Sequence, residues 1–170
     1  RIPALPREQQ MATARRLFLT AADLPPLLVL AICLTGLRVA SLYDLPHHHQ
    51  MHDDGHLVAV PLRHGRRGEE NTACWTVLGD EAHQMFSPGD LYLLLHRLTA
   101  RGRRFAATDT GRVWCVWAGH DTGHTSPSTS GLASLMRRWG TRHGFTGDDG
   151  QDLAVQLNRL RSTRRVLTRT

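Results

Sequence analysis

Apolar residues recur along most of this chain with the three- and four-residue spacing of amphipathic helices. The stretch at 23–35 is apolar nearly all round, so we expect that helix in the core. Thr20 and Asp23 match a capping box in front of it, and Gly36 fits the turn that ends it. The spacing predicts helices at residues 5–19, 23–35, 38–45, 87–100, 131–143 and from 152 onward.

Two short apolar runs, at residues 57–62 and 73–78, predict a β-hairpin with a charged tip that contains two glycines. Polar composition predicts loops at 46–56 and 119–131, and residues 113–117 predict a short buried strand or turn. The fold class expected is therefore a mainly helical α+β domain, with a small antiparallel hairpin or three-stranded sheet packed on helices.

The length of 170 residues indicates a single domain. Its longest apolar run, residues 24–34, is only about half of the ~20 residues that a transmembrane helix needs. Cys33, Cys74 and Cys115 are widely spaced in apolar surroundings, which indicates reduced core residues of a cytosolic protein. The core is predicted to contain Leu28, Leu30, Ile32, Leu34, Leu42, Leu94, Leu135, Trp139, Leu157 and Leu160.

Positive charge is concentrated near the end of the sequence. All 21 basic residues are arginines and the net charge is +6, to which residues 131–170 contribute eight arginines and three acids. A basic segment on a nearly neutral body favours binding to an anionic polymer. The alternative interpretation is a solvated helix face without a partner.

Several kinds of catalytic site are disfavoured by the sequence. There is no Gly-x-Ser-x-Gly motif, and a phosphate-binding loop of the Gly-Lys type is excluded because the chain has no lysine. A polar cluster could bind metal weakly, but it lies in a predicted loop without a His-Glu-x-x-His helix, so we expect no catalytic metal. This cluster contains His47, His48, His49, His52, Asp53, Asp54 and His56.

Two separated arginine motifs remain, LTGLR at residues 34–38 and NRLRST at 158–163. Arg38 follows a buried helix, so the backbone beneath it is expected to be rigid. Phosphoryl chemistry needs such an arginine, because the charge must be in place before the reaction. The alternative is an ordinary surface arginine after a helix end.

The order of these segments resembles the catalytic domain of tyrosine-type site-specific recombinases, the phage integrase family. The resemblance is carried by residues 19–45, the basic hairpin and residues 158–167, and it extends over about residues 5–170. It implies a domain that binds double-stranded DNA. In this family a tyrosine attacks a DNA phosphodiester and forms a phosphotyrosine link, without a metal or nucleotide cofactor. The family acts as an oligomer on DNA. As a DNA-binding protein of this type, the chain is expected in the cytoplasm, associated with the nucleoid.

By position, the resemblance implies that Arg38 and Arg161 clamp the non-bridging oxygens of one phosphate. Asn158 stands three residues before Arg161, where the family usually has histidine; asparagine can donate a hydrogen bond but cannot act as a general base. Further DNA contacts are expected from the arginines of the hairpin tip and of the last helix. These are Arg66, Arg67, Arg159, Arg164 and Arg165.

The sequence departs from the family in two respects. The hairpin has no lysine to protonate the leaving oxygen, and arginine does not give up its proton. The nucleophilic tyrosine would lie beyond Arg161, whereas Tyr43 and Tyr92 occupy predicted packing positions. We therefore expect the chain, residues 1–170, to be one partial catalytic domain of a longer protein, inactive in DNA cleavage by itself. A non-catalytic DNA-binding module of the same fold and an unrelated helical protein remain alternatives.

Overall fold

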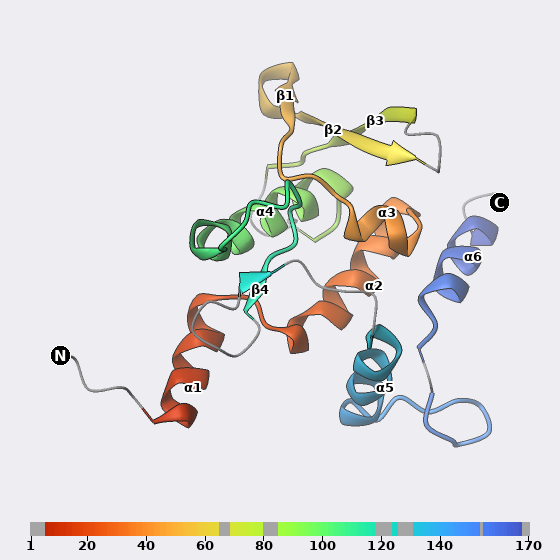
Figure 1. Ribbon diagram of the computed structural model, residues 1–170. Coiled ribbons are helices and arrows are strands. Elements are labelled where there is room, and N and C mark those ends of the chain that lie inside the picture. Colours follow the sequence, from red (N-terminus) through yellow and green to blue (C-terminus); the bar gives the residue numbers. More distant parts are fainter. Residues whose placement is uncertain are drawn as a thin grey trace.

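The computed structural model describes residues 6–64, 69–79, 85–117, 124–125, 131–153 and 155–167. Within these ranges the chain is mainly helical and carries two antiparallel sheets, one in the order β1-β2-β3 and one of β4 and β5 (Figure 1). The expected α+β class is confirmed. The helices are α1 (Arg7–Leu17), α2 (Leu24–Thr35), α3 (Val39–Tyr43), α4 (Pro88–Phe105), α5 (Leu132–Arg142) and α6 (Leu157–Leu167), with the short 3-10 turns η1 (Ala21–Asp23) and η2 (Asp53–Gly55). The strands are β1 (Gln50–His52), β2 (Leu57–His64), β3 (Glu69–Thr76), β4 (Val116–Trp117) and β5 (His124–Thr125).

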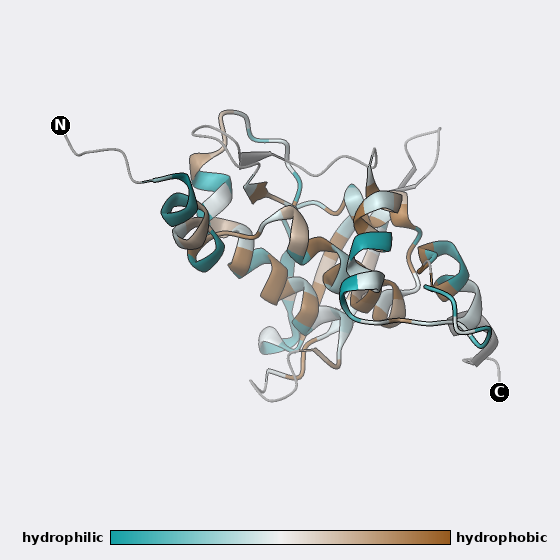
Figure 2. Ribbon diagram, turned by 90° about the horizontal axis from the view of Figure 1, so that it is seen from below, coloured by the Kyte–Doolittle hydropathy of each residue, from teal (hydrophilic) through white to brown (hydrophobic). Residues whose placement is uncertain are grey.

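Helix α2 is the centre of the fold, and its limits agree with the local sequence signals. The Asp23 carboxylate accepts hydrogen bonds from the backbone N–H of Thr20 at 2.7 Å and from its hydroxyl at 2.8 Å. Gly36 ends the helix with a left-handed φ of 67°, which a residue without a Cβ adopts at little cost. Helices α3, α4, α5 and α6 pack around α2, which is hydrophobic along most of its length (Figure 2).

The predicted hairpin is present, and its strands are longer than expected. Strands β2 and β3 pair from Leu57 opposite Thr76 to His64 opposite Glu69. The prediction of a loop at 46–56 is wrong in part, because β1 pairs with β2 along the sheet edge. All three β1 residues are exposed, so backbone pairing rather than apolar alternation defines this strand. Arg66 and Arg67 at the hairpin tip lie outside the described residues.

Helix α4 starts as predicted, since the Ser87 hydroxyl accepts a hydrogen bond from the Asp90 N–H at 3.0 Å. It continues to Phe105, five residues beyond the expected end. The face it buries includes Leu91, Tyr92 and Leu95, which pack toward the sheet and α2.

The predicted core is confirmed for Leu28, Ile32, Leu42 and Leu157, which are buried in one cluster. Four more of the predicted residues are half-buried and pack against that cluster: Leu30, Leu34, Trp139 and Leu160. The prediction is wrong for Leu94 and Leu135, which are half-buried outside it. These two residues flank the buried faces of α4 and α5 rather than lying on them.

The last helix begins at Leu157 and not at residue 152. The backbone N–H of Leu153 donates to the Phe145 carbonyl at 2.7 Å, and Thr146 bridges to Asp152. These bonds close residues 145–153 into a loop, which leaves the Leu153 side chain 48% exposed. Leu153 therefore does not belong to the buried face of α6, which includes Leu157 and Leu160.

The predicted loop at 119–131 contains strand β5, which pairs with β4. Residues 118–123 and 126–130 lie outside the described part of the chain. The three cysteines are free thiols, but only Cys115 is buried. Cys33 and Cys74 are exposed on the solvent-facing sides of α2 and β3, so the prediction of core cysteines is wrong for these two. Among the described helices, none is both long and apolar enough to cross a membrane.

Candidate functional site

The turn between α2 and α3 holds Arg38 on a well-supported backbone. The Thr35 hydroxyl donates to the Ala31 carbonyl at 2.6 Å and accepts from the Leu37 N–H at 3.1 Å. Gly36 then reverses the chain, and Arg38 is the extended residue just before α3. The Arg38 side chain is exposed. A cation therefore projects from a turn whose backbone groups are largely satisfied.

Helix α6 reaches this turn from the far end of the sequence. The Nε of Arg161 donates a hydrogen bond to the Gly36 carbonyl oxygen at 2.8 Å, across 125 positions of sequence. Carbonyls at a helix end lack partners within the helix, and a cation is favourable there because of the helix dipole. Leu157 and Leu160 pack α6 against the core and set this approach. The two arginine motifs singled out in the sequence are thus joined by a direct contact.

The other predicted site residues divide into three groups. Asn158 and Arg159 are exposed on the first turn of α6, three and two residues before Arg161. Arg164 and Arg165 lie on the second half of the same helix, and their side chains are outside the described part of the structure. Arg66 and Arg67 cannot be related to the contact, because they lie outside the described residues. Arg38, Asn158, Arg159 and Arg161 therefore make up the describable part of the candidate site.

Neither tyrosine of the chain is available as a nucleophile. Tyr43 and Tyr92 are only 4% and 2% exposed. Burial raises the pKa of both phenols, which opposes formation of the phenolate. The Tyr92 hydroxyl donates to the Pro46 carbonyl at 2.9 Å, whereas the buried Tyr43 hydroxyl has no hydrogen-bond partner among the described residues. The prediction that both are packing residues is confirmed.

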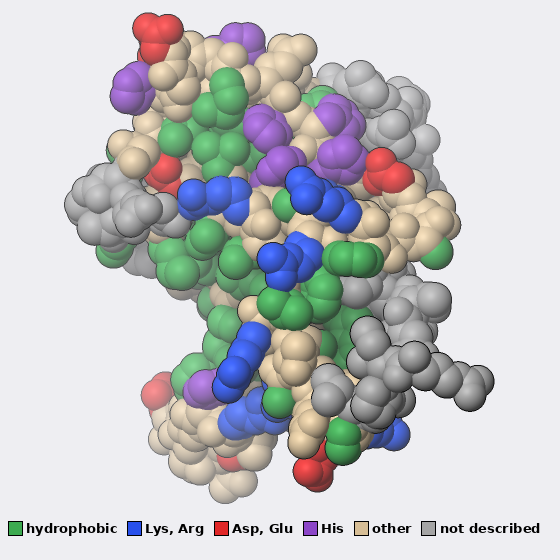
Figure 3. Space-filling model, turned by 90° about the vertical axis from the view of Figure 1, so that its left-hand side faces the viewer, with side chains coloured by type: hydrophobic (Ala, Val, Ile, Leu, Met, Phe, Trp, Pro, Cys, Tyr) green, Lys and Arg blue, Asp and Glu red, His purple; other side chains and the backbone are tan. Residues whose placement is uncertain are grey.

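The segment that contains His47, His48 and His49, called the histidine segment below, packs against α4. The His49 ring lies between the rings of Tyr92 and His96, with centroid separations of 5.3 and 4.9 Å. Nε2 of His47 lies 3.3 Å from the Asp109 carboxylate. Burial, followed by the charge of Arg103, lowers the pKa of His96 to about 4. A group of histidines lies on one face beside arginine side chains (Figure 3).

No three His, Cys, Asp or Glu side chains in the described ranges are arranged to hold a metal ion. The histidine segment instead joins the sheet edge to α4. Sequence reasoning did not find this packing. The available signal was the i, i+4 spacing of Tyr92 and His96, which places both rings on one face of α4.

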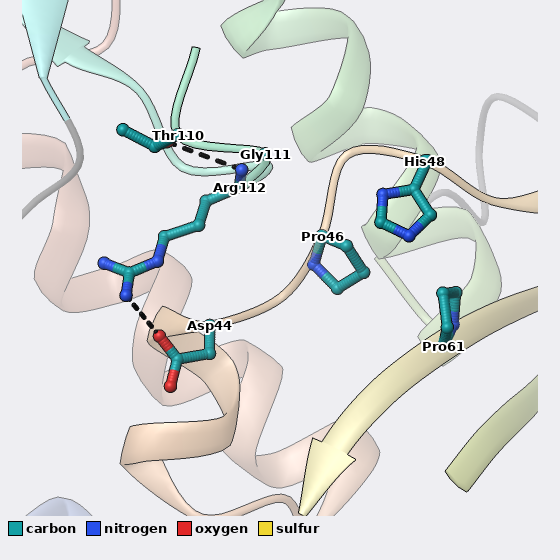
Figure 4. A pocket seen from close by; sticks show the side chains of 7 residues that line it. All are labelled: Asp44, Pro46, His48, Pro61, Thr110, Gly111 and Arg112. Carbon is teal, nitrogen blue, oxygen red and sulfur yellow. Dashed lines mark hydrogen bonds and ion pairs between the residues drawn. The ribbon is translucent and has the colours of Figure 1, made fainter. Parts of the chain in front are cut away.

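A pocket of about 310 Å³ lies beside the histidine segment. Its wall includes an ion pair in which Arg112 lies 2.7 Å from the Asp44 carboxylate (Figure 4). His48 and two prolines, Pro46 and Pro61, line the rest with the turn at 110–111. Because the Asp44 carboxylate pairs with Arg112, this ion pair adds little net positive charge to attract a phosphate group, and we do not count the pocket as an extension of the arginine site. Sequence analysis missed the pocket because three distant segments form it.

Comparisons with known proteins do not identify this site. No family model, curated protein or solved structure matches this chain. The strongest geometric feature is the contact between Arg161 and the turn that carries Arg38. Chemically, this region offers exposed and half-buried guanidinium groups and an amide, which suits recognition of phosphate oxygens.

Proposed function

We propose that this chain is a DNA-binding domain of the tyrosine-recombinase type, which recognises duplex DNA mainly through its phosphates. The single observation that supports this proposal is the hydrogen bond from Arg161 to the Gly36 carbonyl. Recombinase chemistry requires two arginines from distant parts of the sequence at one phosphate. The observed bond joins the second arginine to the turn that presents the first.

The bond also has a chemical consequence for the proposed site. One nitrogen of Arg161, Nε, is engaged with the backbone, which restricts the plane of its guanidinium group. A guanidinium held in one orientation loses less entropy when it binds a phosphate. Arg38 would supply the second cation, and Asn158 a neutral hydrogen-bond donor. Arg159, Arg164 and Arg165 on α6 would extend the contact along the DNA backbone, and Arg66 and Arg67 would add to it from the hairpin.

For this chain, the proposal covers binding and not DNA cleavage. The burial of Tyr43 and Tyr92 favours a second candidate, a non-catalytic DNA-binding module with the same architecture. Cutting and rejoining of DNA, through oligomers on two sites, would require an accessible tyrosine that this sequence does not supply. Both candidates share the same partner and the same arginine surface.

The test is fluorescence anisotropy with one arbitrary DNA duplex and the variants Arg38→Gln, Arg161→Gln and Arg7→Gln. The first two should each weaken binding by about tenfold, because each removes a charge-assisted contact to phosphate. Arg7 is exposed at the start of α1 and serves as the matched control of equal charge change. Absence of duplex binding by the wild-type chain, or equal losses in all three variants, would contradict the proposal.

A further inference from the structure

A groove of about 320 Å³ lies at the opposite end of α2 from Gly36. One wall comes from η1 and the first turn of α2, and the other comes from α5. Helix α2 has 12 residues, so about 18 Å of helix separates this groove from the Arg161 contact. The lining residues are Ala21, Ala22, Pro25, Leu135, Arg138, Trp139 and Arg142.

Trp139, the aromatic residue that lines this groove, packs against two other rings. The Trp139 ring meets the edge of Phe145 at 5.0 Å and lies 5.8 Å from the ring of His143. It is half-buried and packs against the core cluster. Trp139, which lines the groove beside the small side chains of Ala21 and Ala22, is therefore held in position by its neighbours before any ligand binds.

Two arginines, Arg138 and Arg142, line the groove together with Trp139. Arg138 and Arg142 are exposed and are one helical turn apart on α5, so their side chains are neighbours. Neither forms an ion pair with any residue in the described ranges. No acidic side chain is among the described residues that line the groove. The groove thus combines apolar side chains, an aromatic ring and two arginines, with no carboxylate among its described lining residues.

We propose that this groove binds a nucleotide of single-stranded DNA, with the unpaired base on Trp139 and the flanking phosphates at Arg138 and Arg142. Aromatic faces with basic neighbours are the usual means of binding single strands, because every base offers a π-face and every phosphate a charge. A duplex cannot use the indole in this way, since its bases are stacked inside the helix. An acidic peptide could satisfy the arginines but has no planar ring at each charge.

The size of the groove agrees with this assignment. Its volume of about 320 Å³ is at the lower end of the range for small-ligand sites, which suits one nucleotide. The inference does not depend on the recombinase assignment, because the groove uses residues other than Arg38 and Arg161 and binds single-stranded rather than duplex DNA.

The experiment measures binding of fluorescein-labelled oligothymidylate of about ten nucleotides at about 0.15 M salt, by anisotropy and by quenching of tryptophan emission. The double variant Arg138→Gln/Arg142→Gln should bind about tenfold or more weakly. Trp139→Phe keeps a ring against Phe145 and should lower affinity about threefold and remove most of the quenching. Arg137→Gln is the matched control, because Arg137 is exposed on the same helix and does not line the groove.

The expected pattern is a loss in the groove variants with affinity retained in Arg137→Gln. Four results would overturn the proposal: no binding by the wild-type chain, an equal loss in Arg137→Gln, unchanged quenching in Trp139→Phe, or equally tight binding of an oligoglutamate of the same charge. Thermal melts of each variant show whether it is folded. If Trp139→Phe does not fold, the comparison of the double variant with Arg137→Gln decides.

A parallel titration with a duplex separates this inference from the proposed function. Binding of oligothymidylate without duplex binding supports the groove and contradicts the recombinase-type proposal. Duplex binding without oligothymidylate binding contradicts the groove proposal and supports the recombinase-type proposal.

Discussion

Arg161 donates a hydrogen bond from its Nε to the carbonyl oxygen of Gly36 at 2.8 Å and so attaches the last described helix to the end of the central one. The contact joins a residue of α6 to the C-terminal turn of α2, where carbonyl groups need donors from outside the helix. It places one arginine motif against the other.

Replacing Arg161 with Gln should lower the free energy of unfolding by about 1 kcal/mol, because a half-buried, charge-assisted hydrogen bond is lost. The matched control is Arg159→Gln, an exposed position on the same helix, which should change stability by less than about 0.5 kcal/mol. Urea unfolding followed by circular dichroism measures both. Equal stabilities of the two variants would mean that the bond to Gly36 contributes nothing to the docking of α6.

The two tyrosines should respond differently to removal of their hydroxyl groups. Tyr92→Phe should destabilise the fold by about 1 kcal/mol, because it leaves the Pro46 carbonyl without its donor. Tyr43→Phe should be neutral or slightly stabilising, since no described residue forms a hydrogen bond with the buried Tyr43 hydroxyl. Thermal unfolding of the two variants tests the contrast, and a larger loss for Tyr43→Phe would contradict it.

The chain should form no covalent link to DNA, since both tyrosines are buried and burial raises their pKa. Incubation with a nicked suicide duplex, followed by denaturing electrophoresis, should show no protein–DNA adduct. A band that disappears in Tyr43→Phe or Tyr92→Phe would show that one of these side chains reaches DNA.

Salt dependence tests the basic helix. Residues 153–170 contain five arginines and no acid. If about four of them meet phosphates, the log–log slope of duplex affinity against salt should be about −4, because each neutralised phosphate contributes roughly −0.9. Changing Arg164 and Arg165 to Ala should reduce the magnitude of this slope by about 2 and weaken binding to all sequences alike. Binding insensitive to salt would exclude this helix from the DNA interface.

Stability should decrease in mild acid because of His96. Burial lowers its folded-state pKa to about 4, below the ordinary histidine value of 6.5, so the unfolded chain takes up this proton first as the pH falls. The contribution to stability is therefore complete above about pH 6.5 and is lost progressively down to about pH 4. His96→Gln should flatten this part of the pH profile. Urea midpoints at a series of pH values measure the effect, and identical profiles for wild type and His96→Gln would refute it.

Local sequence was sufficient wherever an element is defined by chemistry within a few residues. Thr20 with Asp23 and the glycine at position 36 set the limits of α2, and Ser87 with Asp90 set the start of α4. These signals depend on backbone groups next to the side chains that satisfy them, so no distant contact can easily override them. The hairpin and the α+β class followed from apolar spacing in the same way.

Tertiary packing decided which side of each element is buried. The leucines of α4 allow a buried face that includes Leu94, yet the structure buries the face with Tyr92, because its ring packs with Trp75 of the sheet and His49 of the preceding segment. Strand β1 carries no apolar alternation and exists because β2 offers a free edge. Residues before Leu157 could extend α6 by pattern, but the backbone bond from Leu153 to Phe145 holds them in a loop.

The candidate site is likewise determined in part by local sequence and in part by tertiary packing. The types of residue, an arginine after a buried helix and a basic last helix, are evident in the sequence. Their contact through Gly36, and the groove that combines Trp139 with Arg138 and Arg142, depend on how α6 and α5 pack against α2. The spacing of apolar residues along the sequence gives no information on the distance between segments that are far apart in the chain. That distance is set by burial of apolar surface over the whole core, and only the folded structure determines it.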